Sequence, residues 1–93
     1  MRITERDLKA VVNRINQITG SPLEPYTKQD DGGFKANPGN YHLDHAYGGV
    51  SLKRMCNEGG GVSDVINSGY TTKRDLYNLM QAYIRGLENG NAD

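Results

Sequence analysis

Hydrophobic residues recur at helical spacing near both ends of the chain. At the amino end the intervals of three and four residues define one face of a helix, formed by Leu8, Val11, Val12, Ile15 and Ile18. Thr4 and Asp7 have the spacing of a capping box with an acidic third residue. Gly20 and Pro22 are typical of the residues that end a helix. The pattern predicts a helix from about residue 4 to residue 19.

The second amphipathic pattern lies near the carboxyl end. Its apolar stripe is continuous and consists of Leu76, Leu79, Met80, Tyr83, Ile84 and Leu87. Thr72 and Asp75 repeat the capping spacing at its beginning, and Asn89, Gly90 and Asn91 favour termination. We therefore expect a helix over about residues 72–88, followed by a frayed tail at 89–93.

A loop and a group of strand-like runs separate the two predicted helices. Residues 20–40 contain prolines and Asp-Gly turn chemistry, which predict a loop, although Tyr26–Lys28 and Phe34–Ala36 could pair within it as a short hairpin. Three strand-like runs follow between residues 41 and 66, namely 41–47, 50–56 and 62–66. We expect Gly48 and Gly49 to form a two-residue hairpin turn. Such short turns join antiparallel strands, so the runs predict a meander.

These elements predict one α+β domain of helix, three strands and helix, with both helices on one face of a small antiparallel sheet. A chain of 93 residues has room for one domain with a modest core. Lysine plus arginine equals aspartate plus glutamate at 11 each, so the formal net charge is zero. A neutral surface lacks the self-repulsion that keeps monomers apart, which favours a homo-oligomer, most simply a dimer.

Paired cations are the main charged motif. Lys53 and Arg54 form one pair, and Lys73 and Arg74 form a second pair at the beginning of the last predicted helix. Positive charge is unfavourable at that end of a helix, which indicates contact with an acidic partner. The alternative is a solvated first turn partly neutralised by Asp75. The zero net charge gives no support to binding dominated by nucleic-acid phosphates.

The histidines and the cysteine do not form a recognisable catalytic or metal site. His42 and His45 point to opposite faces of a regular strand, because successive side chains alternate. Cys56 could add a third ligand, but no fourth ligand has zinc spacing, and burial as a small hydrophobe is its usual fate. We expect no metal, no cofactor and no catalytic residues. A single cysteine also excludes an intrachain disulfide.

Glycines and tyrosines provide an alternative, ligand-binding interpretation. Gly59, Gly60 and Gly61 form a loop that could hold a phosphate, although no helix or lysine follows as in nucleotide-binding loops. Tyrosine rings beside glycines could stack on a planar, nucleotide-like ligand. The ligand-contacting residues would be this loop together with Tyr41, His42, His45 and Tyr47. The alternative is a flexible turn, with rings that cap a thin sheet.

The membrane is not an expected partner. The first residues do not resemble a signal peptide, and no apolar run approaches the ~20 residues that span a bilayer. With one cysteine, these features predict a cytoplasmic protein.

Several runs resemble a family of small uncharacterised proteins encoded by tailed bacteriophages and prophages. The runs are residues 40–43, Asn-Tyr-His-Leu, residues 46–49, Ala-Tyr-Gly-Gly, residues 52–55, Leu-Lys-Arg-Met, residues 57–65, and residues 73–77, Lys-Arg-Asp-Leu-Tyr. The resemblance covers just over half of the chain and brings no catalytic residues. It implies a phage gene product that acts in the host cytoplasm, with an accessory role in host takeover or counter-defence.

The order of elements is also similar to that of double-stranded RNA-binding domains. In those domains, lysines at the beginning of the final helix contact phosphates, and here Gly69 precedes Thr72, Lys73 and Arg74. Asp75 and the zero net charge depart from that pattern. Element order alone does not establish function.

The sequence favours a non-enzymatic phage accessory protein that binds a host macromolecule, a host protein in the first instance. The expected contacts are Lys53, Arg54, Lys73 and Arg74. The alternatives are a nucleic-acid-binding module and a small-ligand binder or sponge. An enzyme is the least favoured class, because no acid–base pair is positioned by the sequence.

Overall fold

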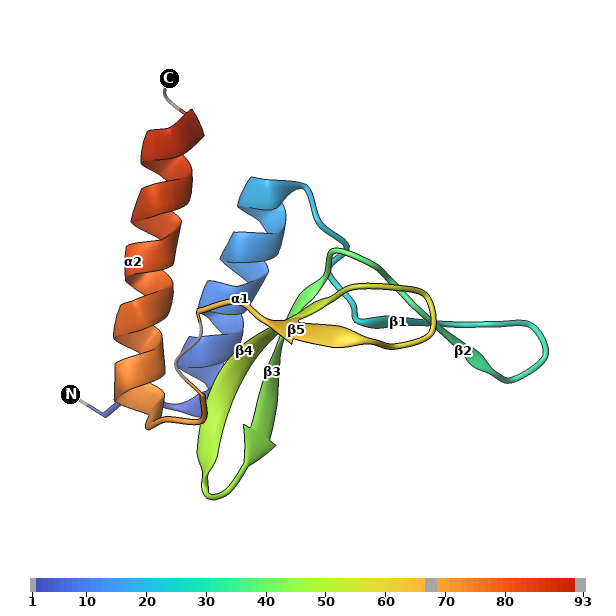
Figure 1. The fold of residues 1–93 in the computed structure, drawn as a ribbon, viewed down its shortest axis with the longest axis horizontal. Coiled ribbons are helices and arrows are strands. Elements are labelled where there is room, and N and C mark those ends of the chain that lie inside the picture. The colour runs from blue at the N-terminus through green and yellow to red at the C-terminus, as the bar shows by residue number, and fades with distance from the viewer. Residues whose placement is uncertain (1, 67–68, 92–93) are drawn as a thin grey trace.

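The computed structural model describes residues 2–66 and 69–91, and Figure 1 shows their arrangement. The elements follow in the order α1 (Glu5–Thr19), β1 (Tyr26–Lys28), β2 (Phe34–Ala36), β3 (Tyr41–Ala46), β4 (Gly49–Met55), β5 (Val62–Asp64) and α2 (Lys73–Asn91). This confirms the α+β class, with a helix at each end and antiparallel strands between them.

Helix α1 begins and ends where the sequence predicts. The hydroxyl of Thr4 accepts a hydrogen bond from the Asp7 N–H, and the Asp7 carboxylate accepts one from the Thr4 N–H at 2.9 Å. The hydrogen bond from the Thr4 N–H, together with one that the Thr4 hydroxyl donates to the same carboxylate at 3.0 Å, stabilises the ionised form and lowers the pKa of Asp7. Gly20 then adopts the left-handed conformation, with φ of 69°.

Helix α2 begins as predicted but extends further. The Thr72 hydroxyl accepts a hydrogen bond from the Asp75 N–H at 3.1 Å, as in a helix cap. The helix continues to Asn91 rather than ending near residue 88, so the predicted end is wrong. Asn89 and Gly90 lower helix propensity but do not break a helix as proline does. Of the predicted tail, residues 92 and 93 lie outside the described part of the chain.

Strands β3, β4 and β5 form the predicted antiparallel meander, in that order. Leu43 lies opposite Leu52 in the first pair of strands, and Arg54 lies opposite Ser63 in the second. Strand β5 ends at Asp64 and is shorter than the predicted run. Val65 still donates its N–H to the Leu52 carbonyl, and Val65 and Ile66 pack against the core.

The predicted turn between β3 and β4 is wrong by one residue. Ala46 pairs with Gly49, so the two turn residues are Tyr47 and Gly48, with φ of 54° and 72°. Positive φ at both positions is the geometry of a type I′ turn. Gly49 belongs to β4, where a Cβ atom would lie 3.0 Å from the backbone nitrogen of Thr71. Its glycine is therefore explained by close packing against the segment that leads into α2.

Strands β1 and β2 form the short hairpin that the sequence left open, with Thr27 opposite Lys35. Figure 1 shows this hairpin, hereafter the arm (residues 26–36), extending away from the two helices. Both strands have only three residues, and Ala36 is the buried one.

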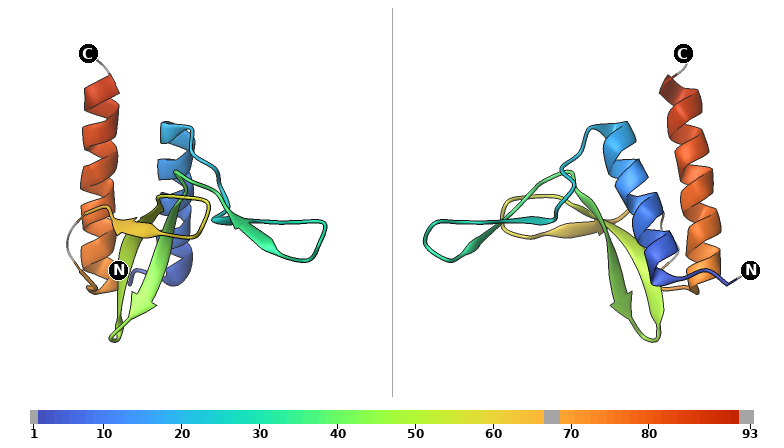
Figure 2. Two further views of the ribbon diagram at one scale, coloured as in Figure 1. Left: turned by 45° about the vertical axis from the view of Figure 1, so that its right-hand side comes forward. Right: turned by 180° about the vertical axis from the view of Figure 1, so that it is seen from behind.

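The core lies between the two helices and the β3–β4 hairpin. Figure 2 shows α1 and α2 side by side, and its right-hand view, from behind, shows α1 nearer the viewer than the β3–β4 hairpin. The helices contribute Leu8, Ile15, Leu76 and Met80 to one buried cluster, and the sheet contributes Tyr41, Val50 and Leu52. Arg14 and Glu88 connect the exposed sides of the helices at 3.0 Å. Within residues 2–66 and 69–91, no helix is long and apolar enough to cross a membrane.

Candidate functional site

Lys53 is occupied by interactions within the molecule. Its ammonium pairs with the Asp64 carboxylate and lies 5.0 Å from the centre of the Tyr70 ring, and its side chain is 13% exposed. The hydrogen bond to Asp64 favours the charged amine and raises the pKa of Lys53. This lysine holds β4 to β5 and to the segment before α2.

Arg54 also has partners inside the chain. Its guanidinium carbon lies 4.8 Å from the centre of the Tyr41 ring, and its Nε donates to the Gly39 carbonyl at 3.2 Å. A planar guanidinium over a ring contributes about 0.5–1 kcal/mol at exposed sites. Arg54 therefore attaches the loop before β3 to the sheet, although its side chain remains exposed.

Lys73 and Arg74 lie at the other end of the sheet from Arg54. Lys73 borders a shallow groove of about 380 Å³ beside Gly49 and Thr71, next to the first residues of β4. Gly49 and Arg54 are five positions apart along β4, which corresponds to about 17 Å. The four cationic side chains that the sequence predicts as partner contacts therefore lie in two separate places. Those of the first pair, Lys53 and Arg54, contact other residues of the chain.

The residues of the ligand-binding interpretation are also separated. Tyr41 is buried, and its hydroxyl contacts the Tyr83 hydroxyl at 2.9 Å. Tyr47 is 94% exposed at the β3–β4 turn, where its ring packs edge-on against Tyr70 at 5.5 Å. The 59–61 loop joins the opposite end of β4 to β5. Tyr47 and these glycines therefore cannot contact one small ligand.

The glycine loop uses its own amides. The Gly61 N–H donates to Oδ1 of Asn57 at 3.0 Å, and the Gly60 N–H donates to the Asn57 carbonyl at 3.2 Å. The Gly61 carbonyl accepts a hydrogen bond from the Cys56 N–H at 2.7 Å. A phosphate nest needs successive free amides, so this loop is better described as a closed turn.

The histidines have separate environments. His42 is half-buried, which lowers its pKa, and its Nδ1 lies 3.2 Å from Oδ1 of Asn40. His45 Nε2 lies 2.9 Å from Oε1 of Glu5 at the beginning of α1. Among the described residues, no three histidine, cysteine or acidic side chains gather as metal ligands would. Cys56 is exposed, contrary to the predicted burial, because β4 ends at Met55.

A polar cluster on the sheet was missed by the sequence interpretation. The Tyr70 hydroxyl donates to the Asp44 carboxylate, and this hydrogen bond raises the pKa of Tyr70. Lys53 lies against the same ring. The cluster fastens the segment before α2 across the sheet. It joins residues 26 positions apart, so local spacing carries no signal for it.

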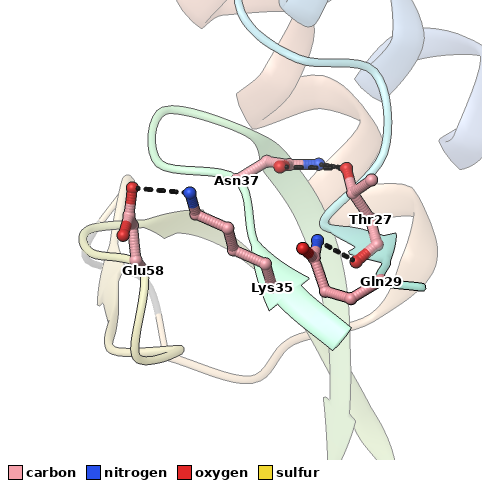
Figure 3. Close-up of polar contacts among 5 residues, drawn as sticks. All are labelled: Thr27, Gln29, Lys35, Asn37 and Glu58. Atoms are coloured by element: carbon pink, nitrogen blue, oxygen red, sulfur yellow. Dashed lines mark hydrogen bonds and ion pairs between the residues drawn. The ribbon is translucent and has the colours of Figure 1, made fainter. Parts of the chain in front are cut away.

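The arm carries the most exposed apolar surface that the sequence interpretation missed. Phe34 is 69% exposed and Tyr26 is 48% exposed, and the register places both on one face of the hairpin. Figure 3 shows the polar contacts of the arm: Asn37 bonds with Thr27, and Lys35 reaches Glu58 of the β4–β5 turn at 3.2 Å. The available signal was a phenylalanine in a hairpin too short to bury it.

Comparison with known proteins adds no relative to this picture. Family models, curated proteins and solved structures were all compared with the chain, and none of them matches. The function must therefore be inferred from the surfaces described above.

Proposed function

We propose that this chain is a small, non-enzymatic binding protein whose arm contacts another protein. The observation that carries this proposal is the exposure of Phe34 on a projecting hairpin. Phe34 is the only phenylalanine of the chain, and it is 69% exposed.

The energetics of the hairpin support a partner. A two-stranded hairpin is at best marginally stable alone, and this one has three-residue strands. Its polar contacts are made with Glu58 and with the loop at Glu24, whose carbonyl accepts from Asn37 at 3.0 Å. These contacts leave Phe34 to solvent. Burying a phenylalanine contributes about 1.5–3 kcal/mol, which a partner surface would supply.

The chemistry of the arm favours a protein over a nucleic acid. Aromatic anchors dominate the binding energy of protein interfaces, with tyrosine among the enriched residues. Nucleic-acid binding depends instead on a concentration of positive charge. The net charge here is zero, and Lys53 and Arg54 are engaged within the chain.

The resemblance to phage proteins extends the proposal to the setting. We propose a host protein as the partner, met in the host cytoplasm during takeover or counter-defence. Protein binding by the arm and the identity of the partner as a host protein can be tested separately, because the arm can be tested with any partner that it captures.

Site-specific photo-crosslinking tests the proposal. A benzophenone amino acid replaces Phe34 in one variant and Tyr47 in a matched control, since Tyr47 is an exposed aromatic at a different turn. We expect the position-34 variant to crosslink to one defined protein in host cells and the position-47 variant to give no such product. With the purified partner, Phe34→Ala should weaken the Kd at least tenfold, or about 1.4 kcal/mol. Tyr47→Asn, which suits the positive φ, should leave it unchanged.

Two results would contradict the proposal. One is an unchanged affinity of the Phe34→Ala variant for the captured protein. The other is tight binding of duplex RNA or DNA that weakens steeply with salt and disappears when Lys73 and Arg74 are replaced by alanine. That second result would establish the nucleic-acid alternative, in which the arm has no part.

A further inference from the structure

The hydrogen bonds that β4 makes on its side away from β3 show which backbone groups of β3 point to its outer, unpaired edge. Val50 exchanges backbone hydrogen bonds of 2.9 and 3.0 Å with Thr71, and the Leu52 carbonyl accepts from Val65 at 3.3 Å. Val50 and Leu52 of β4 therefore direct these backbone groups away from β3. His45 and Leu43 lie opposite them in the register. In an antiparallel pair, such residues direct their own N–H and C=O groups outward.

Asn16 of α1 already pairs with this edge at Tyr41, two residues before Leu43. Its Oδ1 accepts from the Tyr41 N–H at 2.8 Å, and its Nδ2 donates to the Tyr41 carbonyl at 3.0 Å. The Asn16 side chain is fully buried. Its amide thus takes the place of one residue of a neighbouring strand. Within residues 2–66 and 69–91, the outward groups of Leu43 and His45 have no such partner.

A groove of about 450 Å³ runs beside these two residues, between the β3 edge and α1. Its apolar lining includes Val12, Leu23 and Leu43. Its charged lining consists of Glu5, Glu24 and Lys9. The groove therefore offers backbone hydrogen bonds on one side, apolar surface along its length, and one more carboxylate than ammonium.

We propose that the free edge of β3 binds an extended peptide segment of a partner protein, which adds as a strand beside Leu43 and His45. Strand addition derives affinity from main-chain hydrogen bonds and specificity from alternate side chains. Here one apolar side chain would enter the groove, and a lysine or arginine two residues away, on the same face of the added strand, would meet Glu5 or Glu24. This site is separate from the arm, so either could fail without the other.

A second copy of the chain fits this edge less well than a peptide. Symmetric antiparallel pairing through Leu43 and His45 places Asp44 directly opposite Asp44 of the other copy, and like charges in that position are destabilising. A register shifted one way engages Tyr41, whose edge Asn16 already occupies. A shift the other way engages the Tyr47 turn, where the strand has ended.

The test uses capped hexapeptides of the form acetyl-Lys-Thr-X-Thr-Arg-Thr-amide, where X is Val, Ile, Leu or Phe and lies on the same face of the strand as Lys and Arg. We expect at least one to bind the full chain and to protect the Leu43 and His45 amides from hydrogen exchange, while the same peptide with Glu in place of Lys and Arg binds at least tenfold more weakly. His45→Pro removes the outward N–H without touching a ladder bond, so an edge strand tolerates it. His45→Ala is its matched control, because both variants lose the contact with Glu5. We expect the proline variant to bind at least tenfold more weakly than the alanine variant.

Three results would overturn the proposal. The first is equal affinity of the two His45 variants for the peptide, with both variants shown to be folded. The second is the failure of every peptide to alter exchange at Leu43 and His45 in the unmodified chain, a readout that does not depend on any variant folding. The third is protection of both amides that rises with protein concentration alone, which would assign the edge to a second copy.

Discussion

At the scale of single residues, Asn16 determines how α1 packs against β3, which its position in the sequence does not indicate. It follows Ile15 on the apolar side of α1, is fully buried, and makes both of its hydrogen bonds to the backbone of Tyr41. A side-chain amide presents an N–H donor and a C=O acceptor side by side in a fixed geometry, which matches the N–H and C=O of a strand residue. Asn16 thereby fixes how α1 meets β3.

Replacing Asn16 with alanine should reduce the free energy of unfolding by about 2–4 kcal/mol. The change leaves the Tyr41 N–H and C=O without their partners, and each buried unpaired group costs about 1–3 kcal/mol. Asn13→Ala is the control, because Asn13 is exposed one turn earlier in the same helix. Urea unfolding at neutral pH measures both variants. Equal stability of the two would show that the Asn16 hydrogen bonds contribute little.

Residues with local partners were predicted better than residues with distant ones. The Thr4–Asp7 cap needs a spacing of three and was predicted correctly. The sequence predicts a turn at Gly48 and Gly49, because glycine readily adopts positive φ, whereas Gly49 is small because Thr71 lies against it. The sequence predicts that Lys53 contacts a partner, but in the structure its ammonium contacts Asp64 and Tyr70. Neither contact is visible in the nearby sequence.

At the scale of elements, two tyrosines join β3 to α2. The Tyr41 and Tyr83 rings pack edge-on at 6.0 Å, and their hydroxyls lie 2.9 Å apart. Burial, assisted by this hydrogen bond, raises the pKa of Tyr83 to about 12. The contact connects the strand that Asn16 holds with the helix at the other end of the chain.

This raised pKa makes the contact sensitive to alkali. The unfolded chain releases the Tyr83 proton near pH 10, whereas the folded chain retains it until about pH 12. The unfolded state therefore binds fewer protons in this window, so the contribution of Tyr83 to stability is complete below pH 10 and is lost between pH 10 and 12. Tyr83→Phe should lower stability by about 1 kcal/mol at pH 8, because the hydrogen bond is lost.

The difference in the free energy of unfolding between the unmodified protein and the Tyr83→Phe variant should then narrow as the pH rises from 10 towards 12. Urea unfolding at pH 8, 10 and 11 measures it, and comparison of the two proteins cancels the titration of lysines common to both. Tyr26→Phe is the control, because Tyr26 is an exposed tyrosine of the arm outside this contact. A difference that stays constant up to pH 11 would show that Tyr83 titrates as an exposed tyrosine.

At the scale of the whole molecule, the arm and the core differ in how they are held. The molecule extends 44 × 38 × 21 Å, and Figure 1 shows the arm along the longest direction. The core has two helices and a buried cluster, whereas the arm has exposed strands and polar contacts. Regions with few buried apolar contacts open at lower free energy than the core.

Native-state hydrogen exchange should therefore show two classes of amides. The ladder amides of β1 and β2 should exchange through local opening, with protection well below that of α1, β4 and the first turns of α2. Lys35→Ala should lower the protection of the arm alone, by no more than about 1 kcal/mol, because its ion pair with Glu58 is exposed. Lys28→Ala is the matched control in the neighbouring strand. Equal protection of arm and core would mean that the two unfold together.

The sequence alone determined the helices, the meander and the class of the fold. These depend on local rules: the 3.6-residue period of the apolar stripes, the caps at Thr4 and Thr72, and short turns that join only antiparallel strands. Interactions over a few residues suffice for them. The exact ends of β5 and α2 depend on packing, and there the predictions failed.

Only the tertiary structure decided which surfaces are available for binding. It paired Lys53 with Asp64, placed Tyr41 in the core, separated Tyr47 from the glycine loop, and exposed Phe34 and the outer edge of β3. The physical reason is that a side chain is available only if no distant residue reaches it. Register, burial and pairing across tens of residues decide that, and a linear pattern of residue types does not contain them.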